Sequence, residues 1–373
     1  MKVTAETLSK AKALLKVQIP DAVLQGLLEK IPNEEVMPMA LGVMEQAIAE
    51  VPAGTPAEQA VGLVMQKMQK LSASKRADAP GNPRQFTRQY FDNIWLEQRL
   101  LSAELPDTSM ELFGERFSTP IMTAALSHLN IHGAAQENAM AAFADGARQA
   151  GTVHWVGMCE DEEYERIAET GACIVRIIKP YADEDKIFRQ IRKAEETGAL
   201  AVGMDIDHMF TESGNLDVVR GEAMGLKSMD TLRRYIDATS LPFIIKGVLS
   251  VKDALSCAEI GAKGIVVSHH NGHLWFLVPP LMVLPEITKA VGSQMEVFVD
   301  CGISSGADAY KALAMGAKAV SVGSHLIPSL NKGGSAAVAD RIREMTAELK
   351  GLMANTGVAD TKSFDPTVLH VLK

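Results

Sequence analysis

From about residue 115 onward, short apolar runs alternate with segments of helix length. The runs are nearly continuous in apolar character, which is typical of strands in a parallel sheet that is covered on both faces. Several follow a glycine directly, as in ETGACIVRII and EIGAKGIVVSHH, because glycine adopts the left-handed conformation that ends a helix. The predicted strands are residues 120–126, 153–158, 173–178, 201–206, 243–247, 264–269, 297–302 and 319–323.

Eight strand and helix units in succession predict an α/β fold, a (β/α)8 TIM barrel. A doubly wound open sheet is the alternative, because the pattern does not tell whether the sheet closes. In a barrel the functional residues lie at the carboxyl ends of the strands. Polar or sulfur-containing side chains collect at those ends: Ser127, Met158, Lys179, Asp205, Asp207, Lys246, His269, His270, Asp300 and Ser324.

The first 85 residues follow a different pattern. Apolar residues recur there at helical spacing, and Thr55 with Pro56 gives a capped start to one helix in TPAEQAVGLVMQKMQKL. A polar stretch, KRADAPGNPRQ, follows this helix. We therefore predict an N-terminal helical region with a linker over residues 1–85 and a barrel over residues 86–373.

Composition narrows the class of protein. The chain is 47% hydrophobic, enough for a sizeable core, and its net charge of −9 without a long basic run argues against nucleic acid as a partner. The four cysteines have no CxxC spacing, which is typical of reduced thiols rather than of a zinc ribbon or a disulfide framework. No apolar run reaches the roughly 18 residues of a membrane span. We expect a soluble cytoplasmic protein that binds a small molecule and neither membrane nor nucleic acid.

The segment IVVSHHNGH places three histidines around one Asn-Gly pair at a strand end. A metal site, a catalytic base and a structural loop rich in histidine are the three interpretations. Adjacent side chains on a strand point to opposite faces, so His269 and His270 are poorly placed to share an ion, and we predict no metal. A base needs an orienting carboxylate, and Asp207 ends the strand that lies two before that of His270.

Lysine and glycine mark the later strand ends. Lys246 follows three apolar residues, where a lysine stabilises an anion, forms a Schiff base or makes a structural salt bridge, and all three stay open. In VFVDCGISSGADAYKALAMGAKAVSVGS, Gly302 and Gly306 precede one helix, and Gly323 with Ser324 follows the next strand. Bare backbone N–H groups at helix N-termini bind phosphate, and the seventh and eighth loops of a barrel are the usual place for such a site. We therefore expect a ligand that carries a phosphate.

From about residue 120 to residue 330 the order of segments resembles the FMN-dependent α-hydroxy acid oxidases and dehydrogenases, the family of glycolate oxidase and lactate oxidase. The matching segments are IIKGVLSVKDA, then GIVVSHHNG where the family usually has VSNHGGRQ, then FVDCGISSGADAYKALAMGAKAVSVGS where it has DGGxRxGxDxxKALALGAxxVxxGR. The resemblance implies a barrel that binds FMN across its mouth, usually in a homo-oligomer. It also implies an oxidoreductase that acts on a 2-hydroxy acid or a related small alcohol.

Carried over residue by residue, the resemblance makes His270 the base that takes the hydroxyl proton while hydride passes to flavin N5. Asp207 then corresponds to the partner of this base, Lys246 to the cation near flavin N1 and O2, and Asp300 to the acceptor of ribityl hydroxyl groups. Asp205 replaces a neutral residue beside the flavin, and a carboxylate there would lower the reduction potential by repulsion. The other implied cofactor-binding residues are Ala125, Ser268, Gly302, Ser304, Gly323 and Ser324.

Several positions depart from the family pattern. His273 stands where the family has an arginine that binds the substrate carboxylate through two hydrogen bonds, which a neutral histidine cannot reproduce. Lys179 stands near a family tyrosine that helps to hold the substrate, and no segment like YDYYASG occurs near the N-terminus. Ser304 and Ser324 replace arginines at the phosphate end. We expect changed substrate recognition, with Lys179 and His273 at the substrate, and low affinity for FMN.

Two other functions stay open. One is a phosphate-binding lyase or isomerase that uses Lys246 without flavin redox chemistry, which borohydride trapping of an adduct at Lys246 would favour. The other is a flavin-binding protein without turnover, with the N-terminal helices as an interaction surface.

Overall fold

The computed structural model describes residues 3–15, 19–29, 37–49, 51, 55–57, 59–64, 80–101 and 103–372. The chain divides into two compact units, Met1–Asn82 and Pro83–Lys373. The described elements of the first unit are the helices α1 (Ala5–Leu14), α2 (Asp21–Leu28) and α3 (Met37–Ala49).

Apolar side chains at helical spacing form the core of the first unit. Leu24, Leu27 and Leu41 are at most 1% exposed within it. The N-terminus of α1 is capped by Thr4, whose side chain accepts a hydrogen bond from the backbone N–H of Thr7 at 3.1 Å. Of the helix predicted after Pro56, residues 59–64 are helical, and its later part lies outside the described residues.

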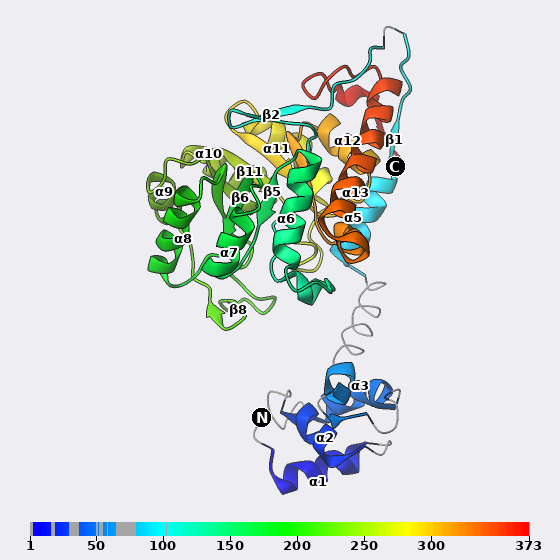
Figure 1. The fold of residues 1–373 in the computed structure, drawn as a ribbon, viewed down its shortest axis with the longest axis vertical. Helices are drawn as coiled ribbons and strands as arrows, with labels where there is room; N and C mark the ends of the chain where they lie inside the picture. Colours follow the sequence, from blue (N-terminus) through cyan, green and yellow to red (C-terminus); the bar gives the residue numbers. More distant parts are fainter. Residues whose placement is uncertain are drawn as a thin grey trace. The chain divides into compact units, whose positions relative to one another are not determined.

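Eight parallel strands form the barrel of the second unit (Figure 1). Their order in the sheet is β4, β13, β12, β11, β10, β7, β6, β5. Each falls on one of the eight predicted apolar runs, so the predicted α/β barrel is confirmed. The strands are β4 (Ile121–Thr123), β5 (His154–Val156), β6 (Ile174–Ile178), β7 (Ala201–Asp205), β10 (Phe243–Val248), β11 (Gly264–Val267), β12 (Glu296–Val299) and β13 (Ala319–Val322).

The sheet closes between its first and last strands. Leu126, just after β4, forms a parallel bridge with Val156 of β5, and the backbone N–H of Gly157 donates to the Leu126 carbonyl at 3.0 Å. Because these bonds join the two ends of the strand order, the open-sheet alternative is wrong.

A helix follows each barrel strand and covers its outer face (Figure 1). After β7 the chain makes a long excursion before its helix, and that excursion contains the hairpin of β8 (Val218–Val219) and β9 (Glu222–Ala223). The covering helices are α6 (Ala139–Ala150), α7 (Asp161–Ala168), α8 (Glu184–Glu196), α9 (Met229–Asp237), α10 (Val251–Glu259), α11 (Pro280–Val291), α12 (Gly306–Ala314) and α13 (Ile327–Asn355).

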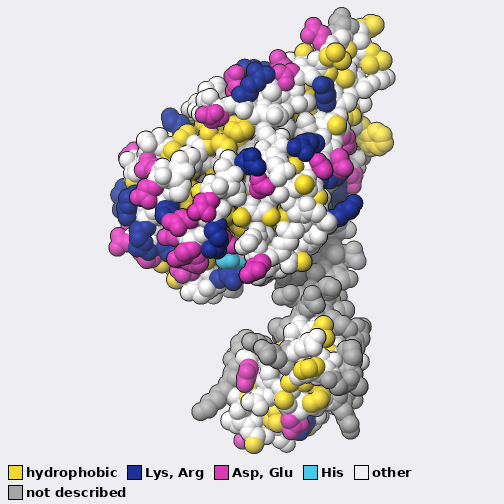
Figure 2. Space-filling model, viewed as in Figure 1, with side chains coloured by type: hydrophobic (Ala, Val, Ile, Leu, Met, Phe, Trp, Pro, Cys, Tyr) yellow, Lys and Arg dark blue, Asp and Glu magenta, His cyan; other side chains and the backbone are white. Residues whose placement is uncertain are grey.

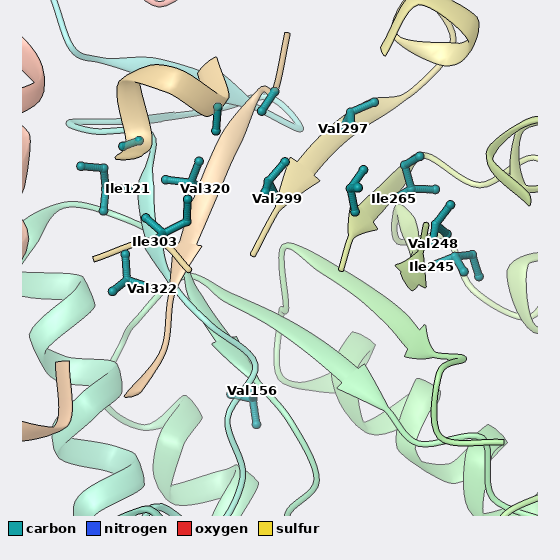
Figure 3. Close-up of a cluster of buried hydrophobic side chains, with 14 of the residues drawn as sticks. Ile121, Val156, Ile245, Val248, Ile265, Val297, Val299, Ile303, Val320 and Val322 are labelled. Atoms are coloured by element: carbon teal, nitrogen blue, oxygen red, sulfur yellow. The ribbon is translucent and has the colours of Figure 1, made fainter. Parts of the chain in front are cut away.

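Strand side chains fill two layers of core. One set points into the barrel, where the rings of Trp155 and Phe298 meet edge to face at 5.2 Å between centroids. The hairpin of β2 (Met110–Leu112) and β3 (Glu115–Phe117) joins this inner cluster. The other set belongs to the larger core cluster, which also contains side chains of the surrounding helices. Figure 3 shows members of this cluster on the strands, among them Ile121, Val156, Ile245, Val299 and Val320.

A helix that precedes the barrel in sequence packs on the loops at its carboxyl end. This helix is α5 (Pro83–Asp92), and the Lys311 ammonium donates to the carbonyl of its Phe91 at 2.8 Å. The following strand β1 (Ile94–Leu96) pairs antiparallel with β14 (Leu369–Val371), so the C-terminus returns to this segment (Figure 1). The carboxyl end of the barrel therefore receives residues from outside the eight strand and helix units.

Basic and acidic side chains are mixed over the face of the barrel unit in Figure 2, without a field of one sign. Within the described ranges, no helix combines the length and the apolar character that crossing a membrane requires.

Candidate active site

A cavity of about 560 Å³ opens at the carboxyl end of the barrel. The ends of β4, β10, β11, β12 and β13 contribute to its lining, together with α5. A hollow of similar volume, about 570 Å³, lies where the strands begin, beside Phe113 and Glu296. Buried titratable side chains, described below, border the first cavity. This cavity lies at the carboxyl end of the barrel, where active sites are found in this fold.

His269 fixes α5 over this cavity. Its Nε2 lies 2.7 Å from the Thr87 hydroxyl, and its Nδ1 accepts a hydrogen bond from the backbone N–H of Gly272 at 3.1 Å. Because Nδ1 is an acceptor, Nε2 carries the proton and donates to Thr87. Burial lowers the pKa of His269, in agreement with a neutral ring. His269 therefore has a structural role, which the sequence did not assign.

Lys246, at the end of β10, lies among three carboxylates. Its Nζ is 3.4 Å from Asp300, 3.7 Å from Asp205 and 3.9 Å from Asp207. It also donates to the Ser268 hydroxyl at 3.3 Å. Burial alone would lower the pKa of Lys246, but the carboxylates outweigh burial and raise the pKa well above its usual range. Lys246 is therefore a fixed positive charge.

This charge state bears on the interpretation of Lys246 as a Schiff-base nucleophile. A nucleophilic amine must be unprotonated, and enzymes achieve this by burial or by a neighbouring cation. At Lys246 the neighbours are carboxylates, which act in the opposite direction. The geometry thus disfavours the lyase or isomerase alternative.

Lys179, at the end of β6, forms an ion pair with Asp205, at the end of β7. The distance from Nζ to Oδ2 is 2.6 Å, and both side chains are buried. Burial raises the pKa of Asp205, but the charges of Lys179 and Lys246 outweigh burial and hold that pKa well below its usual range. The Lys179 ammonium is thus directed at Asp205, whereas the sequence predicted a place at the substrate.

His270 contacts the carboxylate that the sequence assigned to it. Its Nδ1 lies 2.9 Å from Oδ1 of Asp207. Its backbone N–H donates to the hydroxyl of Ser268 at 3.1 Å, and its φ of +50° turns the chain after β11 has ended. A left-handed non-glycine residue is uncommon and occurs where the surrounding structure requires it. This turn directs His269 toward α5 and His270 toward β7.

The surroundings of His270 favour its protonated form. Burial lowers the pKa of His270, and the positive charge of Lys246 lowers it further. The negative charges of Asp205 and Asp207 raise the pKa and outweigh both, so it lies above its usual value. The side chain is 31% exposed, and it borders the cavity. His270 therefore combines a carboxylate partner with access to a ligand, as a base requires.

A second histidine and aspartate pair faces the first. Nδ1 of His208 lies 2.9 Å from Oδ2 of Asp217, and Nε2 of His208 lies 3.2 Å from Nε2 of His270. The ring of His273 lies 4.5 Å from that of His208, and its Nε2 donates to the Phe210 carbonyl at 3.0 Å. Sequence reasoning missed His208 and Asp217. The available signal was DIDHMF, in which His208 directly follows the predicted partner of the base.

The end of the cavity where the sequence predicts a phosphate is built on Asp308, near the N-terminus of α12. Asp308 accepts hydrogen bonds from the backbone N–H and the hydroxyl of Ser304, at 3.0 Å and 2.9 Å. Arg88 of α5 binds the same carboxylate through both Nη atoms, at 3.0 Å and 2.9 Å. Sequence reasoning missed the α5 side chains at this cavity, because residues 83–85 were placed in the linker and no helix was predicted over residues 83–92.

The predicted site residues fall into two groups. The cavity is lined by Ala125, Lys246, His270, Asp300, Gly302, Ser304, Gly323 and Ser324. The predicted residues outside the lining are Lys179, Asp205, Asp207, Ser268 and His273, and of these Asp205, Asp207 and Ser268 contact Lys246 or His270 directly.

Two groups of side chains have ligand-type atoms within 4.8 Å of one another: Asp205, Asp207, His208 and His270; and His208, Asp217 and His273. In the first group, Lys246 lies within 4 Å of both carboxylates, and its charge opposes a second cation. In the second group, Nδ1 of His208 is hydrogen-bonded to Asp217, and Nε2 of His273 is hydrogen-bonded to the Phe210 carbonyl. The absence of a metal stays a prediction.

Comparison with known proteins agrees with this geometry. The sequence model of a family described as FMN-dependent dehydrogenase matches residues 75–229 and 211–371. Glycolate oxidase 1 of Zea mays is 30% identical over 311 residues, which span 73% of this chain and 83% of that protein. 2-Hydroxyacid oxidase 1 of Homo sapiens is 29% identical over 305 residues, spanning 71% of this chain and 81% of that protein.

Solved structures give the same result. A mandelate oxidase variant with 2-hydroxy-phenylacetamide has a TM-score of 0.68 at 26% identity, covering 78% of this chain and 90% of its own. A mandelate oxidase variant with a monooxide FMN adduct has a TM-score of 0.69 at 26% identity, covering 88% of this chain and 98% of its own. The family match spans the whole barrel unit together with α5, and the chain belongs to the FMN-dependent dehydrogenase family.

Proposed function

We propose that this FMN-dependent oxidoreductase oxidises a small 2-hydroxy acid, with Nε2 of His270 as the acceptor of the hydroxyl proton. The observation that carries the proposal is the cluster of His270, Asp207 and Lys246, which joins an oriented base to a fixed cation beside a cavity of about 560 Å³.

The residues of the cavity fit FMN. Ala124 and Ala125 give one apolar wall, while Lys246 and Asp300 offer a cation and a hydrogen-bond acceptor. Gly302 has a φ of +81°, and a Cβ there would lie 2.7 Å from Cγ2 of Thr87, so glycine keeps the loop close under α5. When bound at this site, FMN would act as the two-electron oxidant.

The roles of the chain's own residues follow from their contacts. His270 takes the hydroxyl proton at Nε2, because its Nδ1 is held by Asp207. Asp207 fixes the tautomer and stabilises the imidazolium that results. Lys246 would hold a fixed positive charge beside bound FMN and would stabilise the negative charge that the flavin gains as the substrate is oxidised.

Binding of the substrate acid group differs from the arginine-based binding that the family resemblance implies. His273 stands in the arginine position and directs its Nε2 at the Phe210 carbonyl. A single imidazole N–H does not provide the two parallel hydrogen bonds of a guanidinium. We infer that this chain accepts 2-hydroxy acids whose binding depends less on the carboxylate, such as those with a larger apolar group.

An absorbance titration tests the function. Purified protein is loaded with FMN and dialysed, its spectrum is recorded, and a panel of 2-hydroxy acids is added anaerobically. The expected result is retained flavin absorbance that one class of acid bleaches. His270→Gln is expected to retain FMN and to bleach about 10²–10⁴-fold more slowly. Protein that does not retain FMN, or a His270→Gln variant that bleaches at the wild-type rate, contradicts the proposal.

We also propose that the chain forms a homo-oligomer in the cytoplasm. Leu101 and Leu105 are 96% and 94% exposed in the single chain, which leaves apolar surface for a second copy. The four cysteines are free thiols, as in a reducing compartment. Light scattering of the purified protein measures the assembly, and a monomer at all concentrations would contradict it.

A further inference from the structure

Two histidine and aspartate pairs face each other beside the cavity. Asp207 holds Nδ1 of His270 at 2.9 Å, and Asp217 holds Nδ1 of His208 at 2.9 Å. The two Nε2 atoms then lie 3.2 Å apart, and the ring planes are nearly perpendicular, at 89°. Nothing in the family resemblance accounts for the second pair.

This contact limits where the protons lie. Two nitrogen atoms 3.2 Å apart form a hydrogen bond only if one of them carries a proton. Each carboxylate accepts from Nδ1, so each ring has its Nδ1 proton, and a single further proton is shared between the two Nε2 atoms. His270 holds this proton when it is an imidazolium and His208 is neutral.

The charges around the two rings favour this assignment. His270 faces the carboxylates of Asp205 and Asp207, with Lys246 at 3.5 Å from its Nδ1. Burial lowers the pKa of His270, but the carboxylates outweigh burial and the pKa is raised.

His208 lies in different surroundings. It faces Asp217 on its own loop and the rings of His270 and His273. Burial is the main reason that the pKa of His208 is lowered to about 4, and the positive charges of Lys179 and His270 lower it further. Asp205 and Asp217 raise the pKa but do not outweigh these effects. His208 thus presents an unprotonated Nε2 to a protonated neighbour.

We propose that His208, held by Asp217, is a positioning residue that shares the Nε2 proton of His270 and carries that proton away between turnovers. The inference rests on the proposed function, in which His270 is the base. A base that its surroundings keep protonated needs an acceptor before it can take the next substrate proton, and His208 is placed to be that acceptor.

The proton transfer balances without a further reactant. The proton leaves Nε2 of His270, whose electron pair stays on that nitrogen, and bonds to the lone pair of Nε2 of His208. His208 then carries two N–H bonds, releases the Nε2 proton to water and returns to the tautomer whose Nδ1–H is held by Asp217. The His208 side chain is 16% exposed, which gives water access to it.

The substrate hydroxyl and His208 bind the same atom, Nε2 of His270, at different stages of the reaction. His270 has one Nε2, so the substrate hydroxyl occupies it during oxidation, and His208 occupies it before the substrate enters and after the product leaves. Because His270 of the free enzyme already holds this proton, His208 must take it before the first oxidation as well as before later ones. Loss of His208 therefore slows both the first oxidation and repeated turnover.

Nuclear magnetic resonance tests the shared proton without flavin or substrate. In protein labelled with ¹⁵N at histidine, we expect a scalar coupling across the hydrogen bond between Nε2 of His208 and Nε2 of His270. Peaks are assigned with His208→Gln and His270→Gln, and each substitution is expected to remove the coupling. An uncoupled pair in wild-type protein, or His208 protonated on Nε2 alone, overturns the proposal.

Kinetics test the transfer. In His208→Gln, the side-chain amide oxygen still accepts a hydrogen bond from His270 but cannot carry the proton away. We expect its single-turnover anaerobic bleaching rate and its steady-state kcat with an electron-acceptor dye both to fall about tenfold. Added imidazole is expected to restore kcat, which it would not do for a residue that only supports the loop. Asp217→Asn is expected to lower kcat in the same way.

The outcomes separate the two proposals. Unchanged rates in His208→Gln, or losses that imidazole does not restore, overturn the relay while leaving His270 as the base. If wild-type protein bleaches with no 2-hydroxy acid, the proposed function fails, and the coupling between the nitrogen atoms alone decides whether the proton is shared. Melting curves of each variant confirm that it is folded.

Discussion

The ammonium of Lys179 and the carboxylate of Asp205 lie 2.6 Å apart at the ends of neighbouring strands, both shielded from water. Asp205 has a second cation, because Lys246 lies 3.7 Å from its other oxygen. Removing one partner of a buried pair leaves the other charge uncompensated, at a cost of about 3–5 kcal/mol.

The two partners of this ion pair are expected to respond differently to substitution. Asp205→Asn should lower the free energy of unfolding by about 3 kcal/mol or more, because it leaves Lys179 without a counter-charge. Lys179→Met should cost clearly less, since Asp205 keeps Lys246 and His270 as partners. Urea unfolding measures both, with Arg233→Gln as an exposed control expected to stay within about 0.5 kcal/mol. A larger loss in Lys179→Met than in Asp205→Asn would refute this asymmetry.

Gly247 controls the approach of Asp207 to His270. Its φ is +96°, and a Cβ there would lie 2.9 Å from Cβ and Oδ2 of Asp207. Gly247→Ala is therefore expected to displace Asp207 and to slow anaerobic bleaching of the flavin. The control is Gly261→Ala, where φ is +91° and the added Cβ meets nothing within 4 Å. Both variants carry the same backbone strain, so equal bleaching rates in the two would show that the contact with Asp207 is unimportant.

Ser324 stands where the family has an arginine at the phosphate end, and its side chain is exposed beside the cavity. Ser324→Arg is expected to tighten FMN binding about tenfold, equivalent to about 1.4 kcal/mol, because a guanidinium pairs with phosphate. Riboflavin, which lacks the phosphate, should bind as it does to wild type. Flavin fluorescence quenching measures both ligands, and Ser324→Gln controls for the longer side chain. An equal gain for riboflavin and FMN would mean that the added residue does not act on the phosphate.

His154, in β5, is buried, and its Nδ1 lies 2.8 Å from the hydroxyl of Thr123. Burial lowers its pKa from 6.5 to about 3. The unfolded chain binds a proton below pH 6.5 and the folded chain does not, so stability is fully present above pH 6.5 and falls as the pH drops toward 3. The loss approaches about 1.4 kcal/mol for each pH unit within that window.

Replacing His154 should make the free energy of unfolding depend less strongly on pH below 6.5. His154→Asn keeps an amide near Thr123 and cannot take up a proton in this range. Urea unfolding at pH 7, 6 and 5, where carboxylates stay largely ionised, is expected to give a shallower decline for the variant, by about 1 kcal/mol per unit. Parallel declines in the two proteins would exclude His154 as the source.

The fold was predictable because its signal is local. An apolar run such as residues 264–269, preceded by a helix-ending glycine, requires only its own residues to become a covered strand. Eight apolar runs, several of them preceded by such a glycine, predicted the barrel, and each became a strand of it. Closure of the sheet into a barrel was not predictable. The bridge of Leu126 to Val156 joins the two ends of the sheet, and no pattern along the chain shows that these ends are adjacent in space.

For the site, the sequence by itself determined which side chains stand at strand ends, and so it placed Asp207, Lys246 and His270 in one region. Tertiary structure alone decided their partners: the turn at His270 directs its ring at Asp207, and the excursion after β7 brings His208 against its Nε2. The physical reason is that strand periodicity fixes direction only while the strand lasts. Beyond its end, loop conformation and packing against α5 set the contacts, and these depend on residues far apart in the chain.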